Sequence, residues 1–287
     1  MPWNASIRLA YAASGEGRTI ARFAHEGPLR ILQSLHPEGA AICHNVLVHP
    51  PGGLVGGDTL EVDVSGQERT HGLITTPGAA RFYRSEGEAA TQIARIRLAQ
   101  HARLEWLPLE AIYYPGCDAV NRLELDLAPG GEAFGWDIAA LGLPQANQPF
   151  ARGRVRQHIE LRGDWLERAS IDARDARLLD GPLGFAGHRC LATLFFATGS
   201  DMPRARRELA LDAAREAIER DATHRDGAET STRACIAGAT SPSPRVVVVR
   251  ALAPLVEPAF GVLKAVHRAW RPALWGLPPV QPRSWTV

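Results

Sequence analysis

Cysteine, net charge and long apolar runs are all scarce in this chain, and each scarcity excludes a class of protein. The four cysteines, Cys43, Cys117, Cys190 and Cys235, form no Cys-x-x-Cys pair, which argues against a structural zinc site. A formal net charge of +1 gives no basic excess for nucleic acid or an anionic membrane surface. No stretch approaches the roughly 18 apolar residues of a membrane span, and residues 1–8 do not resemble a signal peptide. We therefore expect a cytoplasmic protein without disulfides.

Sequence motifs for several common chemistries are missing as well. The glycine-rich stretch near residue 55 lacks a Gly-Lys-[Ser/Thr] ending, and no Gly-x-Gly-x-x-Gly opens a helix, so we expect no NTP hydrolysis by this chain. No Gly-x-Ser-x-Gly motif is present for a serine nucleophile. The scattered histidines and cysteines do not supply the three or four converging ligands of a closed metal site. We expect no tightly bound cofactor.

What the sequence has in abundance is short alternating segments. Apolar residues make up 45% of the chain and charged residues 22%, which is ordinary for a globular protein. Every second residue is apolar in four segments, which are 7–11, 60–64, 94–98 and 123–127, and in a fifth, 155–161, with the exception of Gln157. Turn residues separate these segments, as at Pro77-Gly78 and Pro129-Gly130-Gly131. This pattern predicts a mainly β body.

Helical patterns come late in the chain. Asp201 and Pro203 are typical of a helix start, and apolar residues then recur at helical spacing to about residue 221. A second helix is predicted over 258–270, ending before Pro272. Residues 222–243 have the composition of a loop, and the apolar run 245–252 is predicted to be a buried strand. We expect one domain over 1–287, with its β body at about 1–200 and 245–252 and helices at about 203–221 and 258–270.

The segment 46–85 makes the chain recognisable. It contains His49-Pro-Pro-Gly-Gly-Leu-Val-Gly-Gly-Asp58 and Thr75-Thr-Pro-Gly-Ala-Ala-Arg-Phe-Tyr-Arg-Ser85. Further matching strings are Leu104-Glu-Trp-Leu-Pro-Leu-Glu110, Trp136-Asp137, Val249-Arg-Ala-Leu252 and Pro282-Arg-Ser-Trp285. In this order the strings resemble the urease accessory protein family UreD, called UreH in some species. The resemblance covers nearly the whole chain and is weakest over about 200–245.

The resemblance carries expectations about fold and role. Members of this family are non-enzymatic scaffolds with a β-helix-like body of stacked strands and two α-helices. They bind apo-urease and the helical partner UreF, which carries the GTPase UreG. Nickel(II) is thought to pass transiently through an internal tunnel, and the acidic residues associated with it fall at Asp58 and Glu167 here. We therefore expect both carboxylates to face an internal polar passage.

Other residues are weaker site candidates. Cys43, His44 and His49 match the family pattern and are possible weak metal contacts, although Cys43 and His44 should point to opposite faces of a strand. Partner-binding candidates combine aromatic and guanidinium groups, which are favoured interface anchors; they are Arg81, Tyr83, Arg84, Trp270, Trp275, Arg283 and Trp285. The tryptophans of the segment 258–287 suggest docking of UreF, with core filling as the alternative.

Two other functions fit some of the residues. A carbohydrate-active β-solenoid enzyme would use Asp58 with Glu61 or Asp63 as paired carboxylates. A generic β interaction module would need no metal role at all. Glu61 and Asp63 lie on the polar side of an alternating segment, where a solvated face also explains them.

Overall fold

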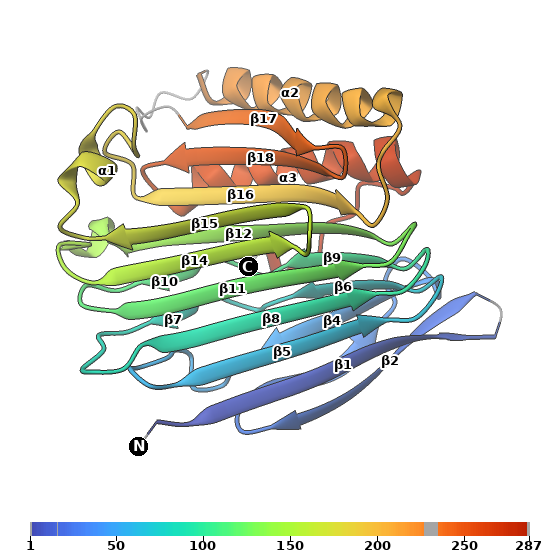
Figure 1. Cartoon of the computed structure of the whole chain (residues 1–287), viewed down its shortest axis with the longest axis horizontal. Coiled ribbons are helices and arrows are strands. Elements are labelled where there is room, and N and C mark those ends of the chain that lie inside the picture. The colour runs from blue at the N-terminus through green and yellow to red at the C-terminus, as the bar shows by residue number, and fades with distance from the viewer. Residues whose placement is uncertain (1, 16, 227–234, 286–287) are drawn as a thin grey trace.

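Two facing β-sheets form the body of the protein, and the chain passes back and forth between them (Figure 1). The computed structural model describes residues 2–15, 17–226 and 235–285. In spatial order the first sheet consists of β15 (Trp165–Asp172), β14 (Arg154–Leu161), β11 (Asp118–Leu127), β8 (Ala90–Leu98), β5 (Thr59–Gly66), β1 (Asn4–Ser14) and β2 (Arg18–Glu26).

The second sheet is larger and carries the short strands. In spatial order its main path consists of β17 (Ile236–Ser243), β18 (Val246–Ala253), β16 (Cys190–Thr198), β12 (Glu132–Leu143), β9 (Arg103–Leu107), β6 (His71–Thr75), β4 (Ile42–Val48) and β3 (Arg30–Leu35). Three short strands pair beside this path, and they are β7 (Ala80–Phe82), β10 (Ala111–Tyr113) and β13 (Gln148–Pro149).

Successive strands alternate between the two sheets, which makes the body a stack of coils. From β4 to β12, each turn of the chain adds one strand to the second sheet and one to the first. Neighbouring coils pair in parallel, as in β5 with β8 and in β6 with β9. A third, short side is made by β7 and β10 and by a bridge between Leu54 and Phe82. The predicted β-helix-like, stacked-strand fold is confirmed.

The alternating segments become strands because each presents an apolar face to the space between the sheets. In β5, Leu60, Val62 and Val64 are buried, whereas Glu61 and Asp63 point outward. The register stacks apolar residues in ladders across strands, since Val62 pairs with Ala94 in β8. Burial of these ladders stabilises the body at roughly 25 cal/mol for each Å² of apolar surface removed from water.

The glycine-rich stretch 52–57 forms the turn that brings two coils together. A Cβ at Gly53 would lie 2.2 Å from the ring of Tyr83, which belongs to the next coil. Gly57 has a φ of +88°, a backbone angle that other residues rarely adopt. These glycines therefore allow the close backbone approach that stacks the coils.

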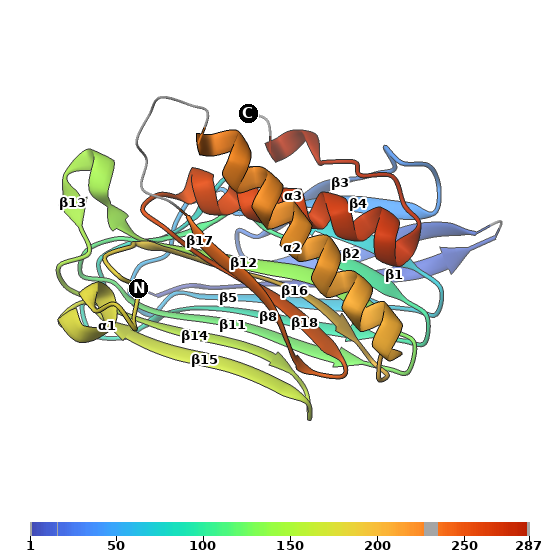
Figure 2. The same ribbon diagram turned by 90° about the horizontal axis from the view of Figure 1, so that it is seen from above.

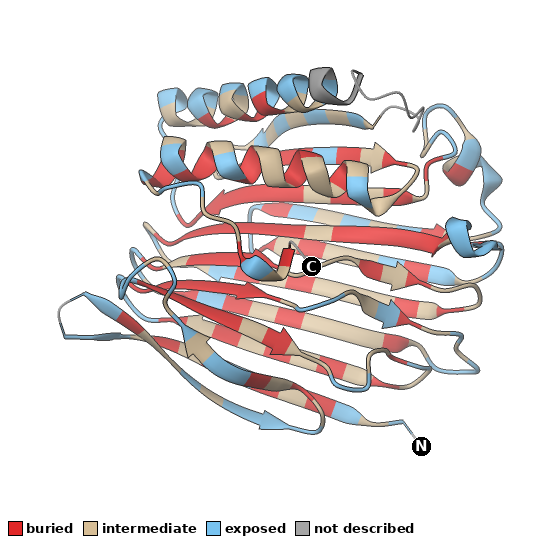
Figure 3. Ribbon diagram, turned by 180° about the vertical axis from the view of Figure 1, so that it is seen from behind, coloured by how far each residue is buried: buried red, intermediate tan, exposed pale blue. Residues whose placement is uncertain are grey.

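Helices cover the outer face of the second sheet. They are the long α2 (Arg204–Asp226) and α3 (Val256–Trp275). The short α1 (Ala176–Asp180) lies instead at the end of the strands, in the connection from β15 to β16, and its Leu179 packs on the core between the sheets. Two 3-10 turns complete the chain, η1 (Pro144–Ala146) and η2 (Arg283–Trp285). The buried residues of α3 face β12, β16 and β18 and form a second apolar core (Figure 3). The α2 helix packs against α3 and β17 (Figure 2).

Three predicted boundaries were wrong. The α2 helix extends to Asp226 instead of ending near residue 221, and β17 occupies 236–243, where we predicted a loop; residues 227–234 lie outside the described residues. Small residues concealed β17, which forms a hairpin with β18 beneath α2. The α3 helix continues through Pro272 to Trp275, because the buried Leu274 and Trp275 hold its last turn and Gly276 closes it in the left-handed conformation.

Candidate functional site

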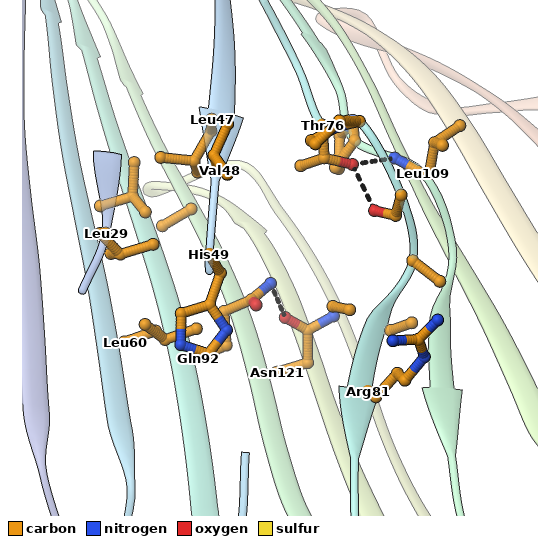
Figure 4. A pocket seen from close by; sticks show the side chains of 18 of the residues that line it. Leu29, Leu47, Val48, His49, Leu60, Thr76, Arg81, Gln92, Leu109 and Asn121 are labelled. Atoms are coloured by element: carbon orange, nitrogen blue, oxygen red, sulfur yellow. Dashed lines mark hydrogen bonds between the residues drawn. The ribbon is translucent and has the colours of Figure 1, made fainter. Parts of the chain in front are cut away.

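A cavity of about 250 Å³ lies between the two sheets, near the third side of the coils. Its lining is mostly apolar, with residues such as Leu47, Leu60 and Trp106. Six polar side chains also line it, and these are His49, Thr76, Arg81, Gln92, Asn121 and Asp137. Figure 4 shows His49 and Arg81 on opposite sides, with the hydrogen-bonded Gln92 and Asn121 between them. The cavity is therefore an apolar chamber with a polar floor.

The polar floor is a ladder of amides on three neighbouring strands. Gln92 of β8, Asn121 of β11 and Gln157 of β14 pair directly in register. Each of the three side chains points into the space between the sheets, because each residue lies two positions before a buried residue of the same strand. Gln92 Nε2 donates to Asn121 Oδ1 over 3.4 Å. A row of amides thus runs across strands where an apolar core is the rule.

Asp137 of β12, on the opposite sheet, accepts hydrogen bonds from two amides of the ladder. Asn121 Nδ2 donates to its Oδ1 over 2.8 Å, and Gln157 Nε2 donates to its Oδ2. Burial raises the pKa of Asp137 to about 6, despite the two hydrogen bonds that lower it. The Tyr113 hydroxyl, fully buried, is without a hydrogen-bond partner among the described residues. The Asp137 carboxyl is therefore the ionisable group on which the ladder converges.

A second cavity, of about 590 Å³, opens beyond Gln157. Gln157 lines it and also bonds Asp137, so the two cavities share one polar connection. Glu167 of β15, Thr193 of β16 and Arg250 of β18 line the same cavity. Inward polar side chains therefore extend from His49 at one end to Glu167 at the other. The cavities, the ladder and Asp137 together are called the interior passage below.

Glu167 is engaged by an arginine. Arg250 Nε lies 3.1 and 3.2 Å from the two carboxylate oxygens of Glu167, and Arg250 Nη2 donates over 2.5 Å. Thr193 Oγ1 donates to the same carboxylate over 3.5 Å. A surface pair with Arg162 or Arg168, which lie close in sequence, is the simplest expectation for Glu167; the structure gives Arg250 instead. Its predicted part in nickel transit stays a prediction.

Asp58 has a structural explanation in the turn before β5. Its side chain is 1% exposed and accepts the backbone amides of Trp3, over 3.2 Å, and Val55, over 2.9 Å. It therefore ties the N-terminal strand to the glycine-rich turn. The neighbouring His49 lines the first cavity, and its Nε2 has no hydrogen-bond partner among the described residues. Burial lowers the pKa of His49, and the charge of Asp58 opposes this. Transit through Asp58 stays a prediction.

Cys43 and His44 point to opposite sides of β4, as the strand geometry required. Cys43 Sγ faces the space between the sheets and contacts Asn45 Oδ1 at 3.7 Å. His44 Nε2 faces the other way and lies 2.8 Å from Glu38 Oε1. The two side chains therefore cannot bind one ion together. Across the described ranges 2–15, 17–226 and 235–285, no group of three or more His, Cys, Asp or Glu residues is arranged to hold a metal.

A buried cluster of charges lies beneath α3 and was not predicted. Glu105 of β9 lies 3.0 Å from His71 Nε2, 2.6 Å from His267 Nε2 and 3.3 Å from Arg271 Nη2. Burial alone would raise the pKa of Glu105, but the hydrogen bonds with His267 and His71 outweigh it and hold the pKa far below its usual range. Arg271 also pairs with Glu38 over 2.8 Å. The cluster fixes α3 to two strands, β6 and β9, and to the loop before β4.

The C-terminal tryptophans fill the core instead of the surface. Trp270 Nε1 donates to Ala210 O, Trp275 Nε1 to Glu132 Oε2 and Trp285 Nε1 to Thr75 Oγ1. All three indoles are buried. The observation that motivated docking through them, an unexplained string of aromatics, has an intramolecular explanation.

The other partner-binding candidates are more accessible. Arg81 and Arg84 are exposed on the third side of the coils, and Arg84 pairs with Glu86. Tyr83 is half-buried and packs on Tyr114, with ring centroids 4.8 Å apart. Arg283 is exposed in η2. Their role in partner binding stays a prediction.

The carbohydrate-enzyme alternative is not supported by the geometry. Glu61 and Asp63 lie on the outer face of the first sheet, where Arg95 approaches them at 3.1 and 3.8 Å. Asp58 faces inward and is bonded to backbone amides. The three carboxylates therefore lie on different sides of the sheet and cannot flank one scissile bond.

Fold and site together define a stacked-strand β scaffold with a polar path between its two sheets. The family model for the UreD urease accessory protein matches residues 4–286. A protein of Variovorax paradoxus (strain S110) named "Urease accessory protein UreD" is 60% identical over 287 residues, which is all of both chains. Proteins of the same name from Paracidovorax citrulli (strain AAC00-1) and Albidiferax ferrireducens are 59% and 55% identical, also over all of both chains.

The chain belongs to the UreD family of urease accessory proteins. It is a non-enzymatic factor of urease maturation. Among the residues that the structure describes, no helix is both long and apolar enough to cross a membrane.

Proposed function

We propose that this chain is the scaffold on which a UreF-like protein and a UreG-like GTPase meet apo-urease in the cytoplasm, and that nickel(II) reaches the urease active site through the interior passage. Nickel is cargo in this proposal and not a resident cofactor. Family membership supports the role in urease maturation. The chain of polar side chains from His49 through the amide ladder and Asp137 to Glu167 supports the route.

The chemistry of the passage suits transit better than storage. Nickel(II) binds thiolates and imidazoles more tightly than single oxygens. The ladder offers amide groups and one carboxylate, each already in a hydrogen bond, and these give only weak contacts. The apolar walls leave the polar floor as the favourable track for a hydrated ion. Weak binding at successive positions allows an ion to leave as well as to enter.

The test is nickel-dependent activation of apo-urease with this chain and its partners, using Asp58→Ala, Glu167→Ala and the double variant. We expect each variant to assemble normally and to slow activation several-fold, with the double variant slower than either single one. Because Asp58→Ala leaves the Trp3 and Val55 amides unpaired, its thermal stability must be measured first. Glu61→Gln on the outer face is the matched control and should leave activation unchanged.

Two outcomes would contradict the proposal. Normal activation by the double variant, at equal yield of the assembled complex, would show that these carboxylates are structural or idle. Failure of the chain to co-purify with urease subunits and a GTPase would remove the scaffold role altogether. Turnover of a polysaccharide by the isolated chain would instead restore the carbohydrate-enzyme alternative.

A further inference from the structure

Arg250 closes the end of the interior passage by joining the two sheets. Glu167 comes from β15, the terminal strand of the first sheet, whereas Thr193 and Arg250 are register partners on β16 and β18 of the second. The ion pair between Glu167 and Arg250 therefore spans the gap between the sheets. It does so in the wall of the cavity that Gln157 connects to Asp137.

The geometry of this pair makes Arg250 a direct competitor of any cation that approaches Glu167. Arg250 donates to both carboxylate oxygens of Glu167. Its Nε lies 3.1 Å from Oε1 and 3.2 Å from Oε2, and its Nη2 lies 2.5 Å from Oε2. Thr193 Oγ1 takes a further position on the same carboxylate. A fork of this kind occupies the lone pairs that a metal would use, and the guanidinium charge repels an approaching divalent cation.

We propose that Arg250 is a latch that occupies Glu167 in the free chain, so that Glu167 becomes a ligand for a divalent cation only when Arg250 is displaced. This inference rests on the proposed function, because it concerns the passage through which nickel would travel. Arg250 is a positioning residue here, acting on the cation only through Glu167.

The pair is placed so that displacement costs little. The side chain of Arg250 is 48% exposed and that of Glu167 is 27% exposed. Exposed ion pairs contribute little to stability, because water and salt screen them. An acidic group on a docking partner can therefore compete for Arg250 at the rim of the cavity. The docking step would then coincide with release of Glu167 toward the passage.

The experiment measures Ni²⁺ binding to the full-length chain by equilibrium dialysis, with the metal alone and no urease. We expect Arg250→Met to bind Ni²⁺ at least about fivefold more tightly than the wild type, within the range of ordinary coupling between sites. Arg250→Lys, which keeps the charge but loses the two-pronged geometry, should lie between them. Glu167→Gln alone should change Ni²⁺ binding less than about twofold, because the carboxylate is already occupied.

Two further variants separate a latch from a simple charge effect. Arg250→Met combined with Glu167→Gln should return Ni²⁺ binding to the wild-type level. Arg245→Met removes an arginine that pairs with Asp201 over 2.9 Å on the same edge of the second sheet, and it should leave binding unchanged. Should Arg250→Met fold poorly, Arg250→Lys with and without Glu167→Gln provides the same comparison.

Unchanged Ni²⁺ binding in Arg250→Met and Arg250→Lys would overturn the latch. So would tighter binding that persists in the double variant or also arises in Arg245→Met. These outcomes differ from failure of the proposed function, which is measured by activation of apo-urease. A chain that activates urease normally while Arg250→Met gains no Ni²⁺ affinity would retain the scaffold and lose the latch.

Discussion

At the scale of single residues, two inward-facing carboxylates, the buried Glu105 and the half-buried Asp137, have pKa values shifted in opposite directions. Glu105 lies among two imidazoles and a guanidinium, which keep it ionised and hold its pKa far below the usual range. Asp137 lies among neutral amides, and burial raises its pKa to about 6. The first carboxylate serves to fix α3 on its sheet, whereas the second is held at an energetic cost inside the passage. Costly charges of this kind are commoner at functional sites than in ordinary cores.

Asp137 should make the protein less stable as the pH rises. Its pKa is about 6 in the folded chain, against 3.8 for an ordinary aspartate, so the folded chain retains a proton that the unfolded chain has lost. The free energy of unfolding then falls as pH rises from about 4 through about 6, by about 2 kcal/mol between pH 4.5 and 7.5. Urea unfolding of the wild type and Asp137→Asn at both pH values measures this.

The variant is its own control for all other titrating groups, which both proteins share. Asp137→Asn should lack the component of about 2 kcal/mol that titration of the carboxyl contributes. It should also lose part of one hydrogen bond, because its amide nitrogen meets a donor from Asn121 or Gln157. Identical pH dependence in the two proteins would show that Asp137 is ionised without penalty.

At the scale of elements, the C-terminal segment is part of the folded core. The Trp285 indole packs on Trp136, with ring centroids 4.9 Å apart, and on Phe260 at 5.8 Å. Arg271 donates to the carbonyl oxygens of Pro278 and Val280 and holds the chain between α3 and η2. The segment therefore closes one end of the second apolar core. Removing residues 277–287 should destabilise the body as well as any partner contact.

We expect Trp285→Ala to lower the free energy of unfolding by about 3 kcal/mol, the cost of deleting a large buried aromatic side chain. Trp285→Phe keeps an aromatic ring and should cost less. Leu183→Ala is the control, because Leu183 is fully exposed and its truncation should change stability by less than about 0.5 kcal/mol. Chemical denaturation of the three variants provides the measurement.

The same variants separate the core role of Trp285 from docking. A folded Trp285→Ala protein with wild-type stability that no longer captures a UreF-like partner would favour docking through the indole. Loss of stability with normal capture at low temperature would favour the core role that the contacts indicate.

At the scale of the whole molecule, the passage depends on small and polar side chains at inward positions of adjacent coils. Ala94 of β8 is buried and lines both the first cavity and the small one beside Asp137. Because these cavities adjoin Ala94, there is space for a larger side chain, and its strand neighbours Val62 and Leu123 are apolar and would accept an apolar one. The proposed route therefore has a position where it can be narrowed without removing any polar group.

Ala94→Leu should slow nickel-dependent activation of apo-urease several-fold while leaving assembly with the partners intact. Overpacking costs about 1–3 kcal/mol in a filled core, and the adjoining cavity should keep the cost here at the low end. The matched control is Ala10→Leu on β1, where the side chain points to the outer face. Equal activation by both variants would argue that nickel does not travel between the sheets.

The strands of the β body and the family to which the chain belongs could be determined from the sequence alone. The alternation of apolar and polar residues is a local property of the sequence, so the strands around Leu60, Ala94 and Leu123 could be predicted from it. The strings at 49–58 and 75–85 identified the family. Helix boundaries followed less well, because Pro272 and the small residues of β17 are governed by what packs on them.

Tertiary structure alone decided the functional details. The amide ladder exists because parallel coil stacking brings Gln92, Asn121 and Gln157 into register. The sequence shows each of them as a polar residue at an inward position of its own strand, but it does not show that the three are neighbours. Glu105 meets His267 across 162 positions of sequence, and Glu167 meets Arg250 across 83. No local pattern encodes such pairs, because their energies depend on burial and charge contributed by distant strands.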